Sequence, residues 1–347
     1  MATITKRGEY QFRAVIRRAG FPSRSKTFES KRDAEVWVRE VEGQMDKGSF
    51  IDRTEIERMT FDALVTKYKD EITVSKKGRV KEESKLRTLQ ASFLGRMTLA
   101  AIQPSDITTY RSQRLRSVGP ATVTKEMNLI SNIFAIGASE FHLRGLVNPV
   151  QGIRRPKAPK ARNRRLLQEG DEMDRIITAS NSKLLKVIIP FAVETAMRRS
   201  EMVSIKWKNL DYESQTVYLG DTKNDDSRVV PLSLKAIALL KTLTEPKDKE
   251  LRIFPMEPSS VTHAFTRARD RARELYEVEM IESGTKPNPM FLMDLRLHDM
   301  RHEATSRLFE DKELEMMEVA AITGHRDFRQ LKNYTHLRAT RIAKKLG

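Results

Sequence analysis

A basic segment near the middle of the chain constrains the fold more than any other feature of the sequence. Residues 154–165 read RRPKAPKARNRR and contain seven basic side chains, two prolines and no acidic or large apolar residue. Such a segment cannot bury a core, and proline favours an extended backbone. We therefore expect residues 151–165 to link parts of the chain that fold separately. An inert tether has no need of seven positive charges, so the segment also predicts contact with a polyanion.

The charge of the whole chain points the same way. Lysine and arginine number 64 against 47 aspartates and glutamates, a formal net charge of +17. Nucleic acid is the first candidate partner, because neutralising phosphates releases counterions and supplies much of the affinity. An acidic membrane is the competing partner, but no apolar stretch approaches the roughly 20 residues that span a bilayer. We expect double-stranded DNA to contact the basic residues of the linker: Arg154, Arg155, Lys157, Lys160, Arg162, Arg164 and Arg165.

The remaining composition bounds the size and location of the protein. A length of 347 residues predicts two or three domains, and 39% apolar residues are enough to bury real cores. The absence of cysteine excludes disulfides, thiol catalysis and zinc sites that use cysteine. The first residues, MATITKRGEY, lack the apolar core of a signal peptide. We expect a cytoplasmic, nucleoid-associated protein of bacterial or phage origin.

Residues 1–50 are expected to form a small α+β module. A first strand is predicted from apolar side chains at alternate positions: Tyr10, Phe12, Ala14 and Ile16. A second short strand should end near Phe28, and Ser30 suits the N-cap of a following helix. Arg13 and Arg17 lie on or next to the first strand, so the sheet is a candidate DNA-binding surface. The alternative is that they are solvated groups at a sheet edge, where basic residues discourage aggregation.

Residues 59–150 are expected to be all helical. Thr60 can cap a helix, and further helices are expected to open at Ser105-Asp106 and at Thr122. Residues 166–347 are also predicted to be mainly helical, apart from two strands, 216–219 and 228–232, that form a hairpin.

Four separated pieces of this last region combine residues suited to phosphate chemistry. They are TAMRRSEM at 195–202, Lys223 at the hairpin tip, LHDMRHEA at 297–304 and TGHRDFRQLKNYTH at 323–336. His298 and Arg301 are three residues apart and so share one face of a helix.

These pieces resemble, in their order, the motifs of the phage-integrase family of tyrosine recombinases. The resemblance implies a nucleophilic tyrosine, two arginines that grip phosphate, a hairpin lysine and two histidines: Tyr334, Arg198, Arg301, Lys223, His298 and His325. It also implies the fold class, mainly α with small β-sheets. The expected parts are an arm-binding-like module (1–50), a helical core-binding, SAM-like domain (59–150) and a mixed α/β catalytic domain (166–347). Local similarity is greatest to shufflon-type DNA invertases.

The residue types also suit this chemistry on physical grounds. Attack on a phosphodiester builds negative charge on the nonbridging oxygens, and arginine offers a planar donor fork that stays charged. Forming a tyrosine phenolate at neutral pH costs about 4 kcal/mol, which nearby cations and hydrogen bonds can offset. A histidine can help to accept the phenol proton, and Lys223 suits protonation of the departing 5′ oxygen.

Three neighbouring residues complete the sequence-based expectations. Ala196 stands where the family usually has glycine, and we expect the change to be tolerated because alanine is still small enough for close packing. Glu201 is expected to anchor the helix that carries Arg198. His302 is expected to orient the site rather than to contact phosphate.

The resemblance implies no metal and no cofactor, since the phosphotyrosine conserves the energy of the broken bond. It implies a homotetramer on two DNA sites, with a dimer on each site, and leaves room for a DNA-bending accessory protein. The tail after Tyr334 is expected to pack on a neighbouring protomer. The competing functions are a type IB topoisomerase and a non-catalytic DNA-binding regulator. Integration or excision and inversion both remain open as the biological task.

Overall fold

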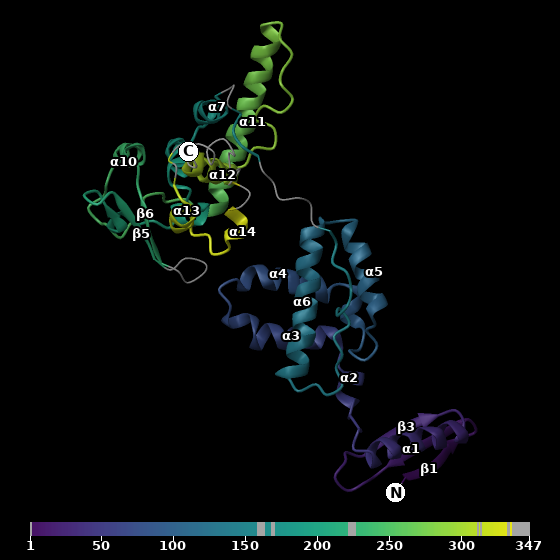
Figure 1. Cartoon of the computed structure of the whole chain (residues 1–347). Coiled ribbons are helices and arrows are strands. Elements are labelled where there is room, and N and C mark those ends of the chain that lie inside the picture. Colours follow the sequence, from purple (N-terminus) through teal and green to yellow (C-terminus); the bar gives the residue numbers. More distant parts are fainter. Residues whose placement is uncertain are drawn as a thin grey trace, which may run out of the picture. The chain divides into compact units, whose positions relative to one another are not determined.

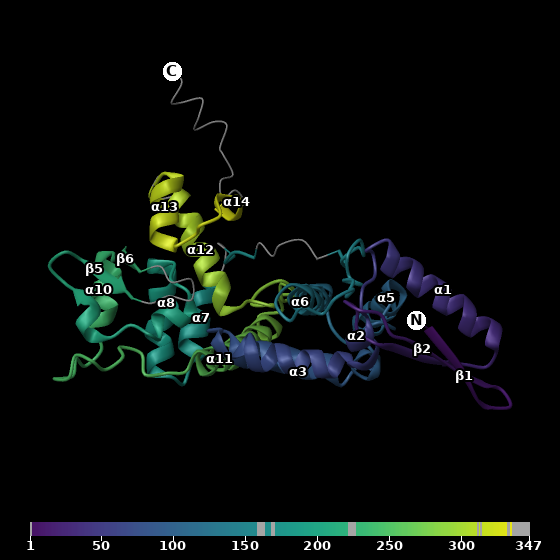
Figure 2. The same ribbon diagram turned by 90° about the horizontal axis from the view of Figure 1, so that it is seen from below.

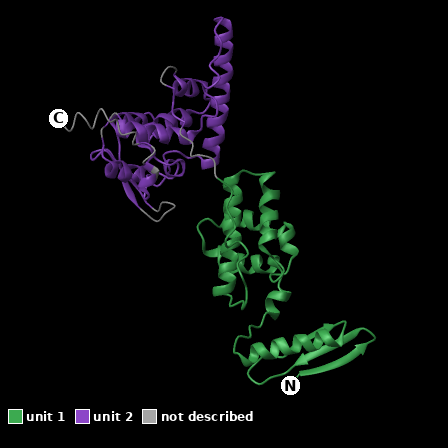
Figure 3. Ribbon diagram, turned by 45° about the vertical axis from the view of Figure 1, so that its right-hand side comes forward, with its two compact units in different colours: residues 1–160 green, residues 161–347 purple. Residues whose placement is uncertain are grey.

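The chain divides into two compact units, residues 1–160 and residues 161–347 (Figure 3). The computed structural model describes residues 2–157, 164–167, 171–220, 227–310, 312, 314–331 and 334. The boundary between the units falls inside the basic segment that predicts a linker. None of the described helices is long and apolar enough to cross a membrane.

The first unit begins with a three-stranded antiparallel sheet and one helix (Figure 1). The strands are β1 (Ala2–Gly8), β2 (Gln11–Ile16) and β3 (Arg24–Phe28), and the helix is α1 (Lys31–Asp46). Ser30 caps α1 as predicted, since its hydroxyl accepts a hydrogen bond from the Asp33 amide at 3.1 Å. The sheet and the helix share one apolar core: Ala14, Ile16, Ala34, Val38, Val41 and Met45.

Two details of the sequence prediction for this module are wrong. The strand β1 is absent from the prediction, because its own side chains bury little and it depends on pairing with β2. Tyr10 lies in the turn between β1 and β2 with 71% of its surface exposed, so it does not belong to the apolar face of the strand.

The rest of the described part of this unit is helical. Its helices are α2 (Thr54–Arg58), α3 (Phe61–Glu71), α4 (Arg79–Gln90), α5 (Pro104–Leu115) and α6 (Pro120–Ser139). The cap at Thr60 is confirmed, since its hydroxyl accepts an amide hydrogen bond of the first turn at 3.2 Å. The helices predicted to open at Ser105 and Thr122 start slightly earlier, because Pro104 and Pro120 occupy the first helical positions.

The helix α8 (Lys183–Thr195) forms the centre of the second unit. Its sequence, KLLKVIIPFAVET, is apolar on nearly every side, as expected of a helix enclosed by others. It packs against α7 (Glu172–Ala179), α10 (Leu234–Lys241), α11 (Pro258–Glu282) and α12 (Leu297–Glu310), and Figure 2 shows it between α10 and α12. The functional side chains come from segments that adjoin this core.

A small antiparallel sheet joins β4 (Leu210–Asp211), β5 (Thr216–Leu219) and β6 (Arg228–Pro231). Its last two strands confirm the predicted hairpin strands, with Val217 opposite Val230, although β6 ends one residue before the predicted Leu232. The hairpin tip, residues 221–226, lies outside the described residues.

Two short helices follow α12, namely α13 (Met316–Thr323) and α14 (Phe328–Leu331). Val319, Ala320 and Leu331 form a small apolar cluster between them, and the Tyr334 ring packs against it. This cluster holds the last described residue beside α12.

Candidate active site

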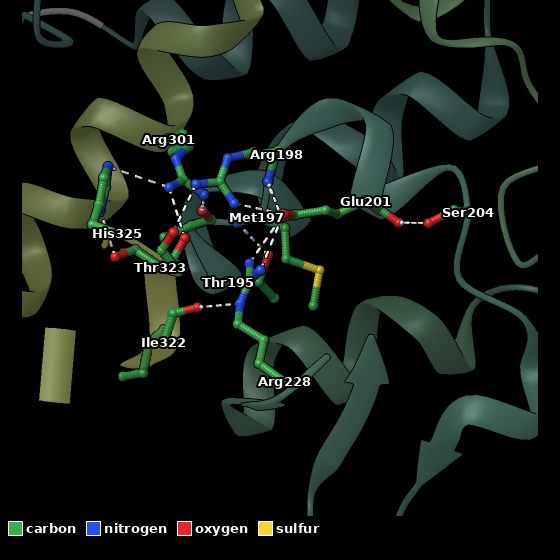
Figure 4. A network of polar contacts seen from close by, with 12 residues as sticks. Thr195, Met197, Arg198, Glu201, Ser204, Arg228, Arg301, Ile322, Thr323 and His325 are labelled. Atoms are coloured by element: carbon green, nitrogen blue, oxygen red, sulfur yellow. Dashed lines mark hydrogen bonds and ion pairs between the residues drawn. The ribbon is translucent and has the colours of Figure 1, made fainter. Parts of the chain in front are cut away.

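The polar side chains of four chain segments converge near the C-terminal ends of α8 and α13, along α12 and at the start of β6 (Figure 4). Arg198 is the N-cap residue of the short helix α9 (Arg199–Met202), which follows α8. Arg301 lies in α12, and His325 comes directly after α13. The structure therefore brings together residues that are up to 127 positions apart in the sequence, from 198 to 325.

The C-terminal end of α13 binds three arginines (Figure 4). Each carbonyl from residue 322 to residue 324 accepts one guanidinium donor: Arg228 Nε to Ile322 (3.2 Å), Arg301 Nη2 to Thr323 (2.7 Å) and Arg198 Nη2 to Gly324 (2.8 Å). The last carbonyls of a helix have no partner within it and carry the negative end of its dipole. Three consecutive peptide groups thereby gather three cations in one place.

Glu201 supplies the negative charge that holds two of these arginines. Its carboxylate accepts from the Arg198 amide and Nη1, both at 2.7 Å, and from Arg228 Nη1 and Nη2 at 3.0 and 2.8 Å. Only 7% of the side chain is exposed, and although burial alone would raise its pKa, the two arginines lower the pKa of Glu201 to about 2. The predicted anchoring role of Glu201 is confirmed.

Arg301 is the most enclosed of the three arginines, at 4% exposure. Besides its bond to Thr323, it donates to the Ala196 carbonyl at 2.5 Å, and its Nη2 lies 3.4 Å from His325 Nε2. Burial and the nearby charge of Arg198 lower the pKa of Arg301 to about 10. Its guanidinium is therefore still charged at neutral pH.

Ala196 ends α8 in the left-handed conformation, with φ of 52°. This backbone geometry turns its carbonyl toward Arg301 and starts the chain toward Arg198. The sequence-based explanation for a small residue here, close packing, is incomplete, because the conformation itself is what favours glycine.

Gly324 has a similar requirement at the end of α13. Its φ is 69°, and a Cβ atom on it would lie 2.7 Å from Arg228 Nη1 and 2.9 Å from Arg228 Cζ. Glycine therefore permits both the C-cap of α13 and the approach of Arg228.

The two histidines of the sequence motifs differ in their contacts. His325 Nδ1 lies 2.6 Å from Thr323 Oγ1, which itself donates to the Val319 carbonyl, so Nδ1 is the protonated nitrogen. His298 lies edge-on to His302, with ring centroids 4.8 Å apart. Desolvation and the neighbouring charges lower the pKa of each of His298 and His325 to about 4, so both rings are neutral at neutral pH.

Tyr334 contacts the side chains of this site at His302. Its hydroxyl is hydrogen-bonded to His302 Nδ1, and the two rings are stacked with centroids 5.6 Å apart. Burial, only partly offset by Arg301, raises the pKa of the Tyr334 phenol. The structure thus places the tyrosine beside His302 and near Arg301 of its own chain.

The remaining predicted site residues fall outside this cluster. Lys223, Lys160 and Arg162 lie outside the described residues. In the described part of the linker, Arg154 and Lys157 are exposed, whereas Arg155 donates to Asn128 Oδ1 at 2.9 Å. In the first module, Arg13 donates to Ser25 Oγ at 3.4 Å and Arg17 is exposed.

Two linker arginines are engaged within the second unit. Arg164 donates to the fully buried Glu172 carboxylate at 2.5 Å, and Arg165 donates to Glu303 and Glu310 at 3.2 and 2.8 Å. These ion pairs join the linker to α7 and α12, a role that the run of positive charge does not predict. DNA contact by the linker stays a prediction.

Sequence reasoning missed Arg228 and the direct contact of His302 with the tyrosine. Arg228 stands at the start of a predicted strand, where a single arginine has no distinguishing signal. His302 follows Arg301 by one residue, but its spacing of four from His298 does place it on the same helical face. Among the described residues, no group of three or more His, Asp or Glu side chains could hold a metal ion.

Comparison with known proteins decides the family. The profile described as the phage integrase family matches residues 167–341. The chain belongs to this family. It is therefore a tyrosine recombinase, an enzyme of the class that breaks and rejoins DNA strands.

Relatives of this recombinase match most of its length. A putative integrase/recombinase of Haemophilus influenzae is 34% identical over 346 residues, covering 96% of this chain and 86% of that protein. A shufflon-specific DNA recombinase of Escherichia coli is 33% identical over 299 residues, covering 84% and 72%. The structure of a lambda integrase tetramer bound to a Holliday junction has the same fold, with a TM-score of 0.61, 18% identity and coverage of 97% and 95%.

Proposed function

We propose that this recombinase cleaves and rejoins DNA at specific sites through a covalent bond between Tyr334 and a 3′ phosphate. The observation that carries the proposal is the convergence of Arg198, Arg228 and Arg301 on one helix end, with Tyr334 on the adjoining segment. The three guanidinium groups carry more positive charge than the Glu201 carboxylate beside them neutralises. The remaining positive charge suits the binding of a phosphodiester.

The proposed reaction follows from the chemistry of these groups. The Tyr334 oxygen attacks phosphorus, and the bond from phosphorus to the 5′ oxygen breaks. Arg198 and Arg301 are held in position before DNA arrives, so they stabilise the charge that builds on the nonbridging oxygens without reorganisation. Lys223, which lies between β5 and β6 in the sequence, supplies a proton to the departing 5′ oxygen. Attack of a 5′ hydroxyl on the phosphotyrosine reverses these steps and rejoins the strand.

A nicked suicide substrate tests this reaction. Loss of the short fragment beside the nick prevents rejoining, so the wild-type chain should accumulate a denaturation-resistant adduct with DNA. Tyr334→Phe removes only the attacking hydroxyl and should abolish the adduct while leaving DNA binding intact. A wild-type chain that binds its site without any adduct would favour a non-catalytic regulator.

The substrate can be found without knowing the site in advance. Covalent complexes are recovered from cells that express the chain under denaturing lysis, and the attached DNA is sequenced. Recovery of one or a few sequences supports site-specific recombination. Adducts spread over arbitrary sequences, with relaxation of any supercoiled plasmid, would instead favour a type IB topoisomerase.

The likeness to a shufflon-specific recombinase favours inversion, whereas the arm-binding-like residues 1–50 favour integration or excision. Inverted repeats next to the gene would support inversion, and an attachment site in a tRNA gene would support integration. Either task would place the protein with DNA in the cytoplasm.

We further propose that four protomers act on two DNA sites, because strand exchange needs two cleavages on each. The tail after Tyr334, which lies outside the described residues, then packs on a neighbouring protomer. Deleting residues 338–347 should impair tetramer formation more than binding to a single site. Equal effects on both would contradict the proposed role of the tail.

A further inference from the structure

We infer that His302, rather than either histidine of the family motifs, accepts the proton of Tyr334 during cleavage. The inference rests on the proposed function and assigns one further catalytic residue to it. His298, Arg301 and His302 occupy successive places on one face of α12. His302 is the member of this set whose ring nitrogen is hydrogen-bonded to the tyrosine hydroxyl.

Ring geometry supports a defined contact rather than a chance approach. The His302 and Tyr334 rings are inclined by 23°, with centroids 5.6 Å apart, while His298 meets His302 edge-on at 82°. His302 therefore contacts both a second imidazole and the phenol, and its Nδ1 is directed at the tyrosine oxygen.

The other two histidines are engaged differently. His325 Nδ1 donates a hydrogen bond to Thr323 Oγ1, and its Nε2 faces Arg301 Nη2, so neither nitrogen is directed at Tyr334. His298 stands one helical turn before His302 on α12 and contacts the His302 ring edge-on.

Several charged or titratable groups surround His302 and bear on its pH dependence. His298, Asp299 and Arg301 lie on its own helix, Tyr334 faces it from beyond α14, and His325 faces it from the end of α13. At the neighbouring His298, Arg301 opposes a positive imidazolium and Asp299 favours one.

The proton transfer balances in both directions. During cleavage the Tyr334 O–H bond breaks, a bond from the proton to His302 Nδ1 forms, and the phenolate electron pair makes the bond to phosphorus. The 5′ oxygen leaves with a proton from Lys223. During rejoining, the 5′ hydroxyl returns its proton to Lys223 as its oxygen forms the bond to phosphorus. The bond from phosphorus to the tyrosine oxygen breaks, and the imidazolium of His302 gives its proton to that oxygen.

Single-turnover adduct formation on the suicide substrate tests the assignment with His302→Gln. General bases typically contribute about 100-fold or more, so we expect a loss of that order at pH 7 with unchanged DNA binding. The loss should shrink as the pH rises toward the pKa of the phenol, because hydroxide then replaces the base. His263→Gln, an exposed histidine of α11 in the same unit, is the matched control and should react like wild type.

A substrate with sulfur in place of the bridging 5′ oxygen separates nucleophile activation from leaving-group protonation. Thiolate leaves without an acid, so this substrate should relieve the defect of Lys223→Ala and leave that of His302→Gln unchanged. His302→Asn provides a second variant if His302→Gln unfolds, which the fluorescence of the buried Trp207 would report.

The outcomes are distinct. A wild-type adduct that Tyr334→Phe abolishes, with a His302→Gln rate within twofold of wild type, would overturn the inference but not the proposed function. A loss that is equal at every pH would also overturn it, since it indicates a structural role. Absence of the wild-type adduct would reject the proposed function itself.

Discussion

Replacing Glu201 with glutamine tests the electrostatic account of the arginine cluster. The substitution keeps the size of the side chain but removes the charge that Arg198 and Arg228 share. The Glu201 carboxylate accepts four hydrogen bonds and donates none. In the glutamine variant, one of its oxygens is replaced by an N–H₂ group, which is a donor and would face the donors of Arg198 and Arg228.

The size of the effect follows from the pKa of Glu201. Lowering that pKa from 4.5 to about 2 corresponds to about 3 kcal/mol of folding stability at neutral pH. Breaking a buried ion pair by removing one partner costs a similar amount, about 3–5 kcal/mol. Because the folded pKa is depressed, this stability is present above pH 4.5 and is lost as the pH falls toward 2.

Urea unfolding followed by tryptophan fluorescence measures this loss in the second unit alone. The chain has two tryptophans, Trp37 in the first module and Trp207 in the core of the second unit, so a Trp37→Phe background isolates the signal. A loss of about 3 kcal/mol lowers the urea midpoint by about 1–2 M.

Glu250→Gln is the matched control. Glu250 pairs with Lys206 and Lys208 but is exposed, and such pairs contribute little to stability. The two glutamine variants should therefore differ clearly at pH 7, and the difference should persist down to about pH 5. Equal midpoints for Glu201→Gln and Glu250→Gln would refute the reasoning.

Three further outcomes follow from the same site. Ala196→Gly should raise the free energy of unfolding by about 1 kcal/mol, because φ is 52° there, and a lower urea midpoint would contradict this. Gly324→Ala should destabilise the unit by about 1–3 kcal/mol and slow adduct formation, since its Cβ would lie 2.7 Å from Arg228 Nη1. Folding lowers the pKa of His325 from 6.5 to about 4, so as the pH falls the unfolded chain takes up a proton at His325 before the folded chain does. The free energy of unfolding should therefore decline as the pH drops through this range. The decline should be smaller in His325→Gln, and an identical pH profile would count against the lowered pKa.

The sequence by itself predicted most of the local elements of this protein and most of the residues that the structure brings together at its site. The caps at Ser30 and Thr60 confirm that short-range hydrogen bonding marks helix starts, because the partner amides lie only three residues away. Strand β1 escaped prediction because its stability comes from a partner strand rather than from its own pattern.

Only the tertiary structure decided how the site residues are held. No spacing in the sequence shows that Arg228 shares Glu201 with Arg198, or that the end of α13 accepts all three arginines. Likewise, the motifs name His298 and His325, but packing of Tyr334 against α12 and α13 places His302 at the hydroxyl. Residue types and their order set which groups are available for chemistry. Long-range packing sets which of them touch, because those contacts depend on the relative placement of helices that are distant in the chain.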